Sequence, residues 1–314
     1  MIDTVSYLAF FLTTALSYAL ICLGLNLQWG QTGLFNVGVA GFVAVGAYVS
    51  AMLTTPTGEH WGGYGLPIFV GWIGAIIGSG IAAAVIGAIT LRLRADYLAI
   101  TTFGVAIVIQ LFALNAQSVT GGPFGIGFIP RPFASLAEDA LGFSLANLGL
   151  VAVVTLVVFV ALERLVRSPW GRVLRAIRED ETAARAIGKN ANLFRLQAFI
   201  LGSAVMGLAG AVQGHFIGFI APENYLSAIT FQTWAMLIIG GSGNNKGAVL
   251  GAILVWGLWS ASGAMMSTVF PPEQQARAAA LQIVAIGVIM AVILLLRPRG
   301  ILGEEVTVSR HLDP

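Results

Sequence analysis

Residues 145–195 read LANLGLVAVVTLVVFVALERLVRSPWGRVLRAIREDETAARAIGKNANLFR, a long apolar run followed at once by the most highly charged stretch of the chain. The first part, residues 145–163, has the length of about twenty residues that a helix needs to cross a hydrocarbon core. The second part, residues 164–195, carries Arg, Lys, Glu and Asp side chains that are costly to place in hydrocarbon. Together they predict a membrane-spanning helix that leads into a loop outside the bilayer.

The composition of the whole chain indicates a membrane protein. Of its 314 residues, 57% are hydrophobic and 10% are charged, and the mean hydropathy is +0.88, whereas soluble domains carry about 25% charged residues. The net charge of +2 is not gathered on a soluble domain, so nucleic-acid binding is excluded. Cys22 is the single cysteine and lies in an apolar run, which excludes an intrachain disulfide and a cysteine-rich metal site.

Apolar stretches of spanning length predict an all-α, polytopic transmembrane helical bundle of about nine spans, forming a single domain over residues 1–314. The stretches are residues 5–29, 36–54, 66–91, 97–115, 145–163, 197–219, 226–241, 248–266 and 278–296. Glycines recur near the second stretch, so we expect the stretch from Gly30 to Gly46 to begin as a broken or re-entrant element.

The distribution of basic residues orients these spans. With the N-terminus outside, nine crossings place fourteen of the sixteen Lys and Arg residues, and the C-terminus, in the cytoplasm. This agrees with the positive-inside rule, and the opposite orientation does not. Residues 116–144 then form a periplasmic loop, and residues 164–196 form a cytoplasmic loop.

The cytoplasmic loop contains an amphipathic pattern. Val173, Ile177, Ala184 and Ile187 recur at spacings of 4, 7 and 3, which predicts one apolar stripe on a single short helix. Such a helix can insert its stripe into a groove on a soluble partner, or it can rest on lipid headgroups, and the periodicity fits both. Membrane-surface helices usually have a purely basic polar face, whereas residues 178–181 mix charges of both signs.

Five segments together resemble the LivM-type permease subunits of branched-chain amino-acid ABC importers, in order and spacing over nearly the whole chain. They are GLNLQWGQTGLFNVGVAGFVAVGAYVSAML at 24–53, RLRADYLAITTFGVAIVIQLF at 92–112, TGGPFGI at 120–126, GRVLRAIREDETAARAIGKN at 171–190 and GLAGAVQGHFIGFIAPE at 207–223. One segment departs from the family pattern: residues 240–248 read GGSGNNKGA, where such permeases commonly carry a less polar turn.

The resemblance implies a set of partners in a bacterial cytoplasmic (inner) membrane. These are a LivH-like second permease subunit, two cytoplasmic ABC ATPase subunits and a periplasmic substrate-binding protein. It also implies that the ATPases hold ATP with Mg²⁺, and that this chain binds no cofactor. The matching loop would be the element that couples the permease to the ATPase, through Gly171, Arg172, Val173, Arg175, Ile177, Arg178, Glu179, Asp180, Glu181, Ala184, Ile187 and Gly188.

No pattern in the chain predicts catalysis, nucleotide binding or a metal site. The glycine-rich turn lacks the Walker A arrangement, because Lys246 precedes Gly247 rather than Ser or Thr. His60, His215 and His311 are scattered and have no Cys, Asp or Glu at ligand spacing. Because no Asp, Glu, Lys or Arg lies centrally in a predicted span, we expect a transporter driven by a partner rather than by ion coupling.

Neutral polar residues in or beside the spans are candidates for lining a translocation path, although hydrogen bonding between helices is the alternative role for each. They are Asn36, Thr101, Gln110, Asn115 and His215. Gly210, Gly214 and Gly218 repeat every four positions and predict a close contact between helices.

These observations predict the permease subunit of an ATP-driven importer, which forms with a second permease subunit the pathway for branched-chain or related amino acids. The same architecture is compatible with urea, short amides or another small organic solute. A membrane scaffold subunit without a pathway of its own is the alternative from a different class.

Overall fold

The computed structural model describes residues 2–56, 63–136, 138–271, 274–297 and 299–303. The longer helices are α1 (Ile2–Leu25), α2 (Val39–Thr54), α3 (Ile68–Thr90), α4 (Ala95–Asn115), α6 (Ala140–Arg167), α9 (Ala191–Ile217), α10 (Ser227–Gly240), α11 (Asn245–Val269) and α12 (Gln275–Leu296). The shorter helices are α5 (Gln117–Thr120), α7 (Pro169–Glu179) and α8 (Glu181–Ala186), with a π-helix η1 (Asn26–Gly30) and 3₁₀ turns η2 (Gly122–Phe124), η3 (Ala134–Leu136) and η4 (Pro222–Tyr225). Within the described residues, an antiparallel bridge between Ile126 and Ile220 is the extent of β-structure, so the predicted all-α class is confirmed.

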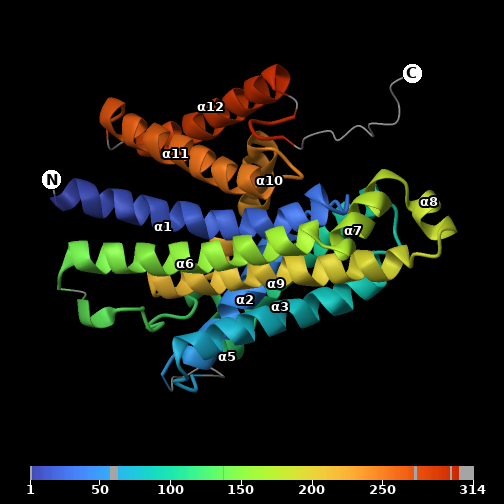
Figure 1. The fold of residues 1–314 in the computed structure, drawn as a ribbon. Helices are drawn as coiled ribbons and strands as arrows, with labels where there is room; N and C mark the ends of the chain where they lie inside the picture. The colour runs from blue at the N-terminus through green and yellow to red at the C-terminus, as the bar shows by residue number, and fades with distance from the viewer. Residues whose placement is uncertain (1, 57–62, 137, 272–273, 298, 304–314) are drawn as a thin grey trace.

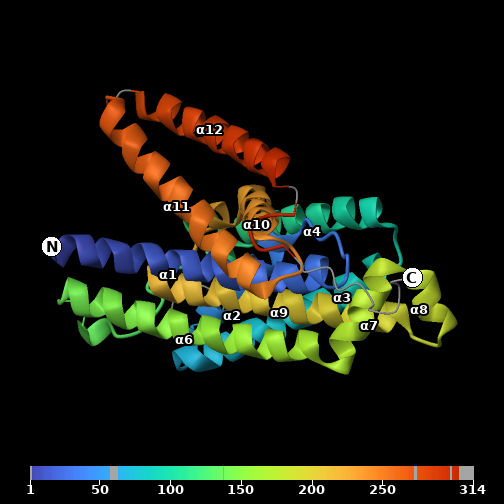
Figure 2. The same cartoon turned by 45° about the horizontal axis from the view of Figure 1, so that its top comes forward.

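The helices form an elongated bundle with a smaller arm (Figure 1). In this view α1, α6, α9 and α3 run along one direction, and α7 and α8 project from one end of the bundle, called here the hairpin end. The arm consists of α11 and α12. The turned view shows that these two helices point away from the bundle (Figure 2).

Contacts distant in sequence show that the connections alternate between the two ends of the bundle. At the hairpin end, residues 26–33 meet α7 and the α10–α11 turn: Arg178 donates to the Gly30 carbonyl oxygen, and the Gly243 N–H donates to Asn26 Oδ1 at 2.8 Å. At the opposite end, Ile126 pairs with Ile220, and the rings of Tyr48 and Tyr225 lie 6.0 Å apart.

Six helical segments are long and apolar enough to cross a membrane: Thr4–Gly30, Ile68–Thr90, Asp96–Asn115, Ala140–Arg167, Ala191–Ile217 and Asn245–Met266. The other three predicted spans correspond to shorter apolar helices, namely α2, α10 and the Arg277–Ile293 part of α12. The 14 residues of α10 rise only about 21 Å, less than the hydrocarbon core of roughly 30 Å. The chain is therefore polytopic, and the count of nine spans remains a prediction.

Helix α9 lies at the centre of the bundle because glycines let its neighbours approach it closely. A Cβ added to Gly46 of α2 would overlap the Gly207 backbone of α9, and one added to Gly207 would overlap Ser79 of α3. The Ser79 hydroxyl in turn donates to the Phe42 carbonyl oxygen of α2 at 3.0 Å. Small residues at such contacts are the usual means by which membrane helices pack backbone against backbone.

The predicted break in the second stretch exists. Helix α1 passes into η1, a turn follows, and the backbone is non-helical as far as Gly38. The stretch thus begins as a broken element, as predicted, whereas Gly41 and Gly46 lie inside the regular helix α2. These two glycines serve close packing instead, since Gly41 faces Ala106 of α4.

Candidate functional site

The charged loop forms two helices rather than the single predicted one. Helix α7 ends at Glu179, and Asp180 adopts an extended conformation with φ −150° and ψ 102°. Its Oδ1 then accepts hydrogen bonds from the Thr182 and Ala183 N–H groups at 2.8 and 3.0 Å, which caps the start of α8. We call residues 168–190 the coupling hairpin.

The ends of the coupling hairpin are set by two glycines. A Cβ on Gly171 would overlap the Val166 carbonyl oxygen, so glycine permits the sharp turn from α6 into α7. Gly188 has φ +81° and follows the end of α8, as expected for a residue that stops a helix.

The apolar stripe of the hairpin faces the rest of the chain. Ile177 and Ala184 are 4% and 3% exposed, and they cluster with Ala191 at the start of α9. Val173 packs against the same cluster. Ile177 and Ala184 are not on the surface, so the expected insertion of the stripe into a partner's groove is wrong for these two, whereas Val173 is half-buried. The turn at Asp180 folds α8 back, and the beginning of α9 covers the stripe.

The opposite face of the coupling hairpin is open. Ile187 is 72% exposed, and Ala183 and Ala186 beside it are also exposed. The exposed charged residues of the hairpin include Arg172, Glu179, Asp180 and Arg185, whereas Arg175, Arg178 and Glu181 are half-buried. A small apolar tip surrounded by charges is therefore available at the end of the molecule (Figure 1).

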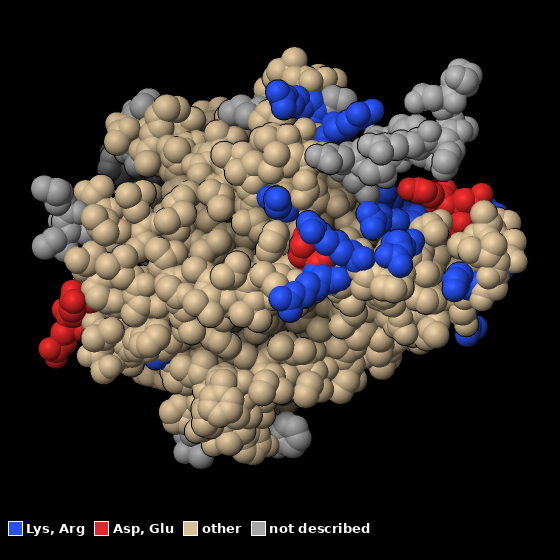
Figure 3. All heavy atoms as spheres, in the orientation of Figure 1, with Lys and Arg blue, Asp and Glu red and all other residues tan. Residues whose placement is uncertain are grey.

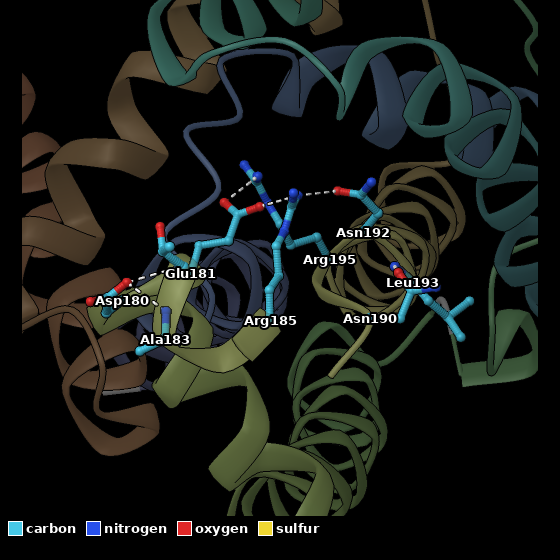
Figure 4. A network of polar contacts seen from close by, with 9 residues as sticks. Asp180, Glu181, Ala183, Arg185, Asn190, Asn192, Leu193 and Arg195 are labelled. Atoms are coloured by element: carbon cyan, nitrogen blue, oxygen red, sulfur yellow. Dashed lines mark hydrogen bonds and ion pairs between the residues drawn. The ribbon is translucent and has the colours of Figure 1, made fainter. Parts of the chain in front are cut away.

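An ion-pair network fixes α8 to the start of α9 (Figure 4). Glu181 accepts from Arg185 at 2.5 Å and from Arg195 at 3.1 Å, and Arg185 also donates to Asn192 Oδ1 at 3.1 Å. The Asn190 side chain accepts from the Leu193 N–H at 3.2 Å and caps α9. The orientation of α8 is thus determined by α9 rather than by the loop alone.

Arg178 connects the coupling hairpin to the break between α1 and α2. Its guanidinium donates to the Gly30 carbonyl oxygen, at the end of η1. Its side-chain carbons also lie against Gly33, where the backbone has φ +71°. The sequence pattern placed Arg178 at the edge of the apolar stripe; the structure adds a contact with a segment about 150 residues away.

The break itself is a buried polar junction. Gln28 donates through Nε2 to the Phe199 carbonyl oxygen and the Ser203 hydroxyl at 2.9 and 3.0 Å, and its Oε1 accepts from Asn36 Nδ2 at 2.7 Å. Trp234 of α10 donates to the Asn36 carbonyl oxygen at 2.9 Å. Because hydrocarbon offers no hydrogen bonds, a non-helical backbone at this depth needs such partners.

The same junction includes the polar turn between α10 and α11. Asn26 donates to Asn245 Oδ1 at 2.9 Å, and Asn245 donates to Glu163 of α6 at 2.9 Å. Gln31 donates to the Gly243 carbonyl oxygen at 2.6 Å. The departure from the family pattern at residues 240–248 therefore supplies partners for Asn26 and Gln31. The sequence analysis missed Asn26 and Gln28, although amides within an apolar run were a signal for them.

The candidate path residues separate into two groups. Asn36 and His215 are fully buried and bound within the chain, His215 through Nε2 to the Ser50 hydroxyl at 2.9 Å and through Nδ1 to the Pro130 carbonyl oxygen at 2.8 Å. Thr101, Gln110 and Asn115 lie on α4, which is largely exposed. At 100° per residue, Thr101 and Asn115 share one face of α4, and Gln110 lies on the other side.

The three candidate packing glycines have different surroundings. Gly210 lies against the Val43 carbonyl oxygen of α2, where no Cβ fits. A Cβ added to Gly214 would lie 3.1 Å from the Ile220 side chain, which is tighter than most Cβ contacts, so Ile220 would have to shift slightly. Gly218 is outside α9 and caps its end with φ +81°. The close helix contact is therefore within this chain, at Gly210.

Among the described residues, no group of three or more His, Cys, Asp or Glu side chains is placed to hold a metal ion. The polar groups that the structure brings together at the hairpin end, which are guanidinium, amide and carboxylate groups, form structural contacts between helices.

Comparisons with known proteins show that this chain is similar to transport permeases. The chain is 34% identical over 267 residues to the high-affinity branched-chain amino acid transport system permease protein LivM of Escherichia coli strain K12, covering 77% of this chain and 60% of that protein. It is 30% identical to the probable branched-chain amino acid transport permease protein LivM of Methanocaldococcus jannaschii, covering 75% of each. It is 26% identical to the permease protein LivH of Salmonella typhimurium, covering 93% of each.

The matched part of this chain spans 60% of the length of the Escherichia coli relative. The family model for the permease component of branched-chain amino acid transport systems matches residues 7–295, almost the whole of the helical chain described above. This protein therefore belongs to the family of branched-chain amino acid transport system permease components.

Proposed function

We propose that this chain is the permease subunit of an ATP-driven importer in a bacterial cytoplasmic membrane, and that it forms a translocation path for branched-chain or related amino acids with a second, LivH-like permease subunit. Family membership and the names of the LivM and LivH relatives support the proposal. Two cytoplasmic ATPases, which bind ATP with Mg²⁺, and a periplasmic substrate-binding protein complete the importer.

In this proposal the hairpin end faces the cytoplasm and the chain crosses the membrane nine times. Two observations support this arrangement, one for the number of crossings and one for the orientation. The connections alternate between the ends of the bundle, as nine crossings require. Most Lys and Arg side chains visible in Figure 3 gather over the half of the molecule that carries α7 and α8, whereas acidic side chains lie at both ends.

The observation that carries the proposal is the coupling hairpin, whose outer face is open and whose inner face is bound to the α1–α2 break through Arg178. An ATPase that contacts Ala183, Ala186 and Ile187 would move a rigid pair of helices. Arg178 would pass that movement to residues 26–38, and hydrogen bonds join this segment to α9, α10 and α11. A scaffold subunit without a pathway would not need to transmit movement from the ATPase to its helices.

The path in this proposal runs along the exposed face of α4, against the second permease subunit. The face contains Thr101, Gly104, Val108, Leu111 and Asn115, which lie within one sector of the helix. A Cβ added at Gly104 would meet nothing within 4 Å, so this face has open space beside it. Small, apolar and neutral polar groups suit a path that passes a zwitterionic solute without holding it.

Reconstitution tests the function. The chain is co-expressed with a LivH-like permease and the ATPases, placed in liposomes and supplied with the binding protein and ATP. Uptake of labelled leucine that requires this chain and ATP supports the proposal. Uptake of labelled urea or a short amide in place of leucine would reassign the substrate, and absence of any ATP-dependent uptake by an assembled complex would support the scaffold alternative.

A pair of isoleucines in the coupling hairpin tests the docking surface. Ile187→Asp places a charge on the exposed tip, so we expect a folded hairpin with at least severalfold less co-purifying ATPase. Ile177→Asp buries an unpaired charge, which costs several kcal/mol, so we expect the hairpin to unfold and to be cleaved faster by a protease. Normal ATPase recovery with Ile187→Asp would exclude the tip as the docking site.

A further inference from the structure

The α3–α4 turn, α8 and the start of α9 enclose a pocket of about 570 Å³ at the hairpin end. The transport proposal gives this pocket no role. Its lining residues are Leu91, Arg92, Leu93, Arg94, Glu181, Arg185, Asn192 and Arg195. Four arginines and one glutamate give the lining a formal charge of +3. The pocket is therefore suited to an anion.

The arginines of the pocket are held in two ways. Glu181 binds both Arg185 and Arg195, and the Arg195 side chain is only 15% exposed, so one wall is rigid (Figure 4). Arg92 and Arg94 form the other wall, are exposed, and make no ion pair among the described residues. The single carboxylate of the described lining cannot neutralise all four guanidinium groups.

Two helix N-termini add to the positive potential. Helix α4 begins directly after Arg94, and α9 begins directly before Asn192. The first turns of helices of this length carry partial positive charge and N–H groups without intrahelical partners. Asp96, in the first turn of α4, is exposed and lies outside the pocket lining.

The position of the pocket along the bundle identifies its occupant. Three apolar segments of spanning length, Ile68–Thr90, Asp96–Asn115 and Ala191–Ile217, all end or begin beside it. The pocket thus lies where a hydrocarbon core gives way to the polar surface, which is the level of lipid phosphates. We propose that it binds the phosphate of an anionic phospholipid.

An apolar surface for the acyl chains adjoins the pocket. Ile77, Ile81, Val85 and Ile89 of α3 are 54%, 60%, 59% and 70% exposed and follow one another at intervals of four residues. This ridge leads to Leu93, which lines the pocket and is 38% exposed. Ile81 to Ile89 covers about 12 Å, close to the depth of one leaflet. A water-soluble acidic partner has no acyl chains that would contact this apolar ridge.

Lipid retention by the complete detergent-purified complex tests the proposal. Tail-labelled phosphatidylglycerol is titrated onto the complex, with phosphatidylcholine carrying the same label as the neutral comparison. Arg92→Ala/Arg94→Ala should weaken phosphatidylglycerol binding by about tenfold or more, because two charge-assisted contacts are lost. Glu181→Gln should strengthen binding, since it removes the one carboxylate of the described lining.

Arg297→Ala/Arg299→Ala is the matched control, because these exposed arginines have the same spacing, lie at the same end of the bundle and do not line the pocket. It should leave binding unchanged. Equal weakening by both double variants would overturn the proposal, as would displacement of the lipid by excess inorganic phosphate. Loss of the ATPases from Arg92→Ala/Arg94→Ala with lipid binding retained would show a protein-docking surface instead.

Discussion

Two of the interruptions between helices near the hairpin end are built in opposite ways. The break at residues 26–38 is buried. Its side-chain amides bind α9 and the α10–α11 turn, and its Asn36 carbonyl oxygen accepts a hydrogen bond from Trp234 of α10. The break at Asp180 is exposed, and its own carboxylate caps the next helix. A buried break must recruit distant partners and so ties helices together, whereas an exposed break can be satisfied locally and leaves its outer face free.

The largest effect is expected at the buried break. Gln28→Leu keeps a similar side-chain size but leaves Asn36, Ser203 and the Phe199 carbonyl oxygen without their partner. Unsatisfied buried polar groups cost about 1–3 kcal/mol each, so we expect a loss of roughly 3 kcal/mol or more. The unfolding midpoint of the purified subunit measures this, and an unchanged midpoint would mean that water or lipid satisfies these groups.

An intermediate effect is expected where the two interruptions meet. Arg178→Ala removes a charged hydrogen bond to Gly30, a contribution of about 1.5–3 kcal/mol. We expect the ATPases to co-purify normally and the amount of amino acid imported per ATP hydrolysed to fall severalfold. Arg178→Lys should restore part of this ratio because it keeps the charge but not the planar geometry.

Arg164→Ala is the control for this experiment, since Arg164 lies on α6, outside the coupling hairpin, and is exposed. Its ratio of import to hydrolysis should equal that of the unmodified complex. If Arg178→Ala also leaves the ratio unchanged, movement reaches the bundle by another route.

The smallest effect is expected at the exposed break. Asp180→Ala removes the cap of α8, which contributes about 1 kcal/mol, whereas Asp180→Asn should retain most of it. Amide hydrogen exchange should accelerate at residues 181–188 and stay unchanged in α9. A fall in the stability of the whole bundle would mean that the capped turn supports more than the hairpin.

The sequence predicted the features of this fold that are local. Apolar length identified six spanning helices, because hydrocarbon thickness sets the length that each helix needs. The glycine cluster correctly indicated that the second stretch begins as a broken element. Propensity and periodicity do not report where a helix finds its hydrogen-bond partners, and the partners of Gln28 lie 171 and 175 residues further along the chain.

The candidate site could be predicted only in part, because local patterns do not report contacts between segments that are distant in sequence. Charge and periodicity located the coupling hairpin and its apolar stripe. They could not tell whether the stripe faces a partner or the chain itself, and it faces Ala191. Arg178 and Glu181 look alike in the sequence pattern, but only the fold brings Gly30 next to the first and Arg195 next to the second.

The buried break also constrains how the protein is made. Gln28 leaves the ribosome 171 residues before its acceptor at Phe199, an interval of roughly 10–30 s at 5–20 residues per second. During that time its amide has no partner in α9, and bare lipid would leave it unsatisfied. Asn36 is the partner of Gln28 that is made first, and the remaining hydrogen bonds form only after α9 has been made. A short polar segment thus makes the final packing of α1 depend on a helix that is synthesised much later.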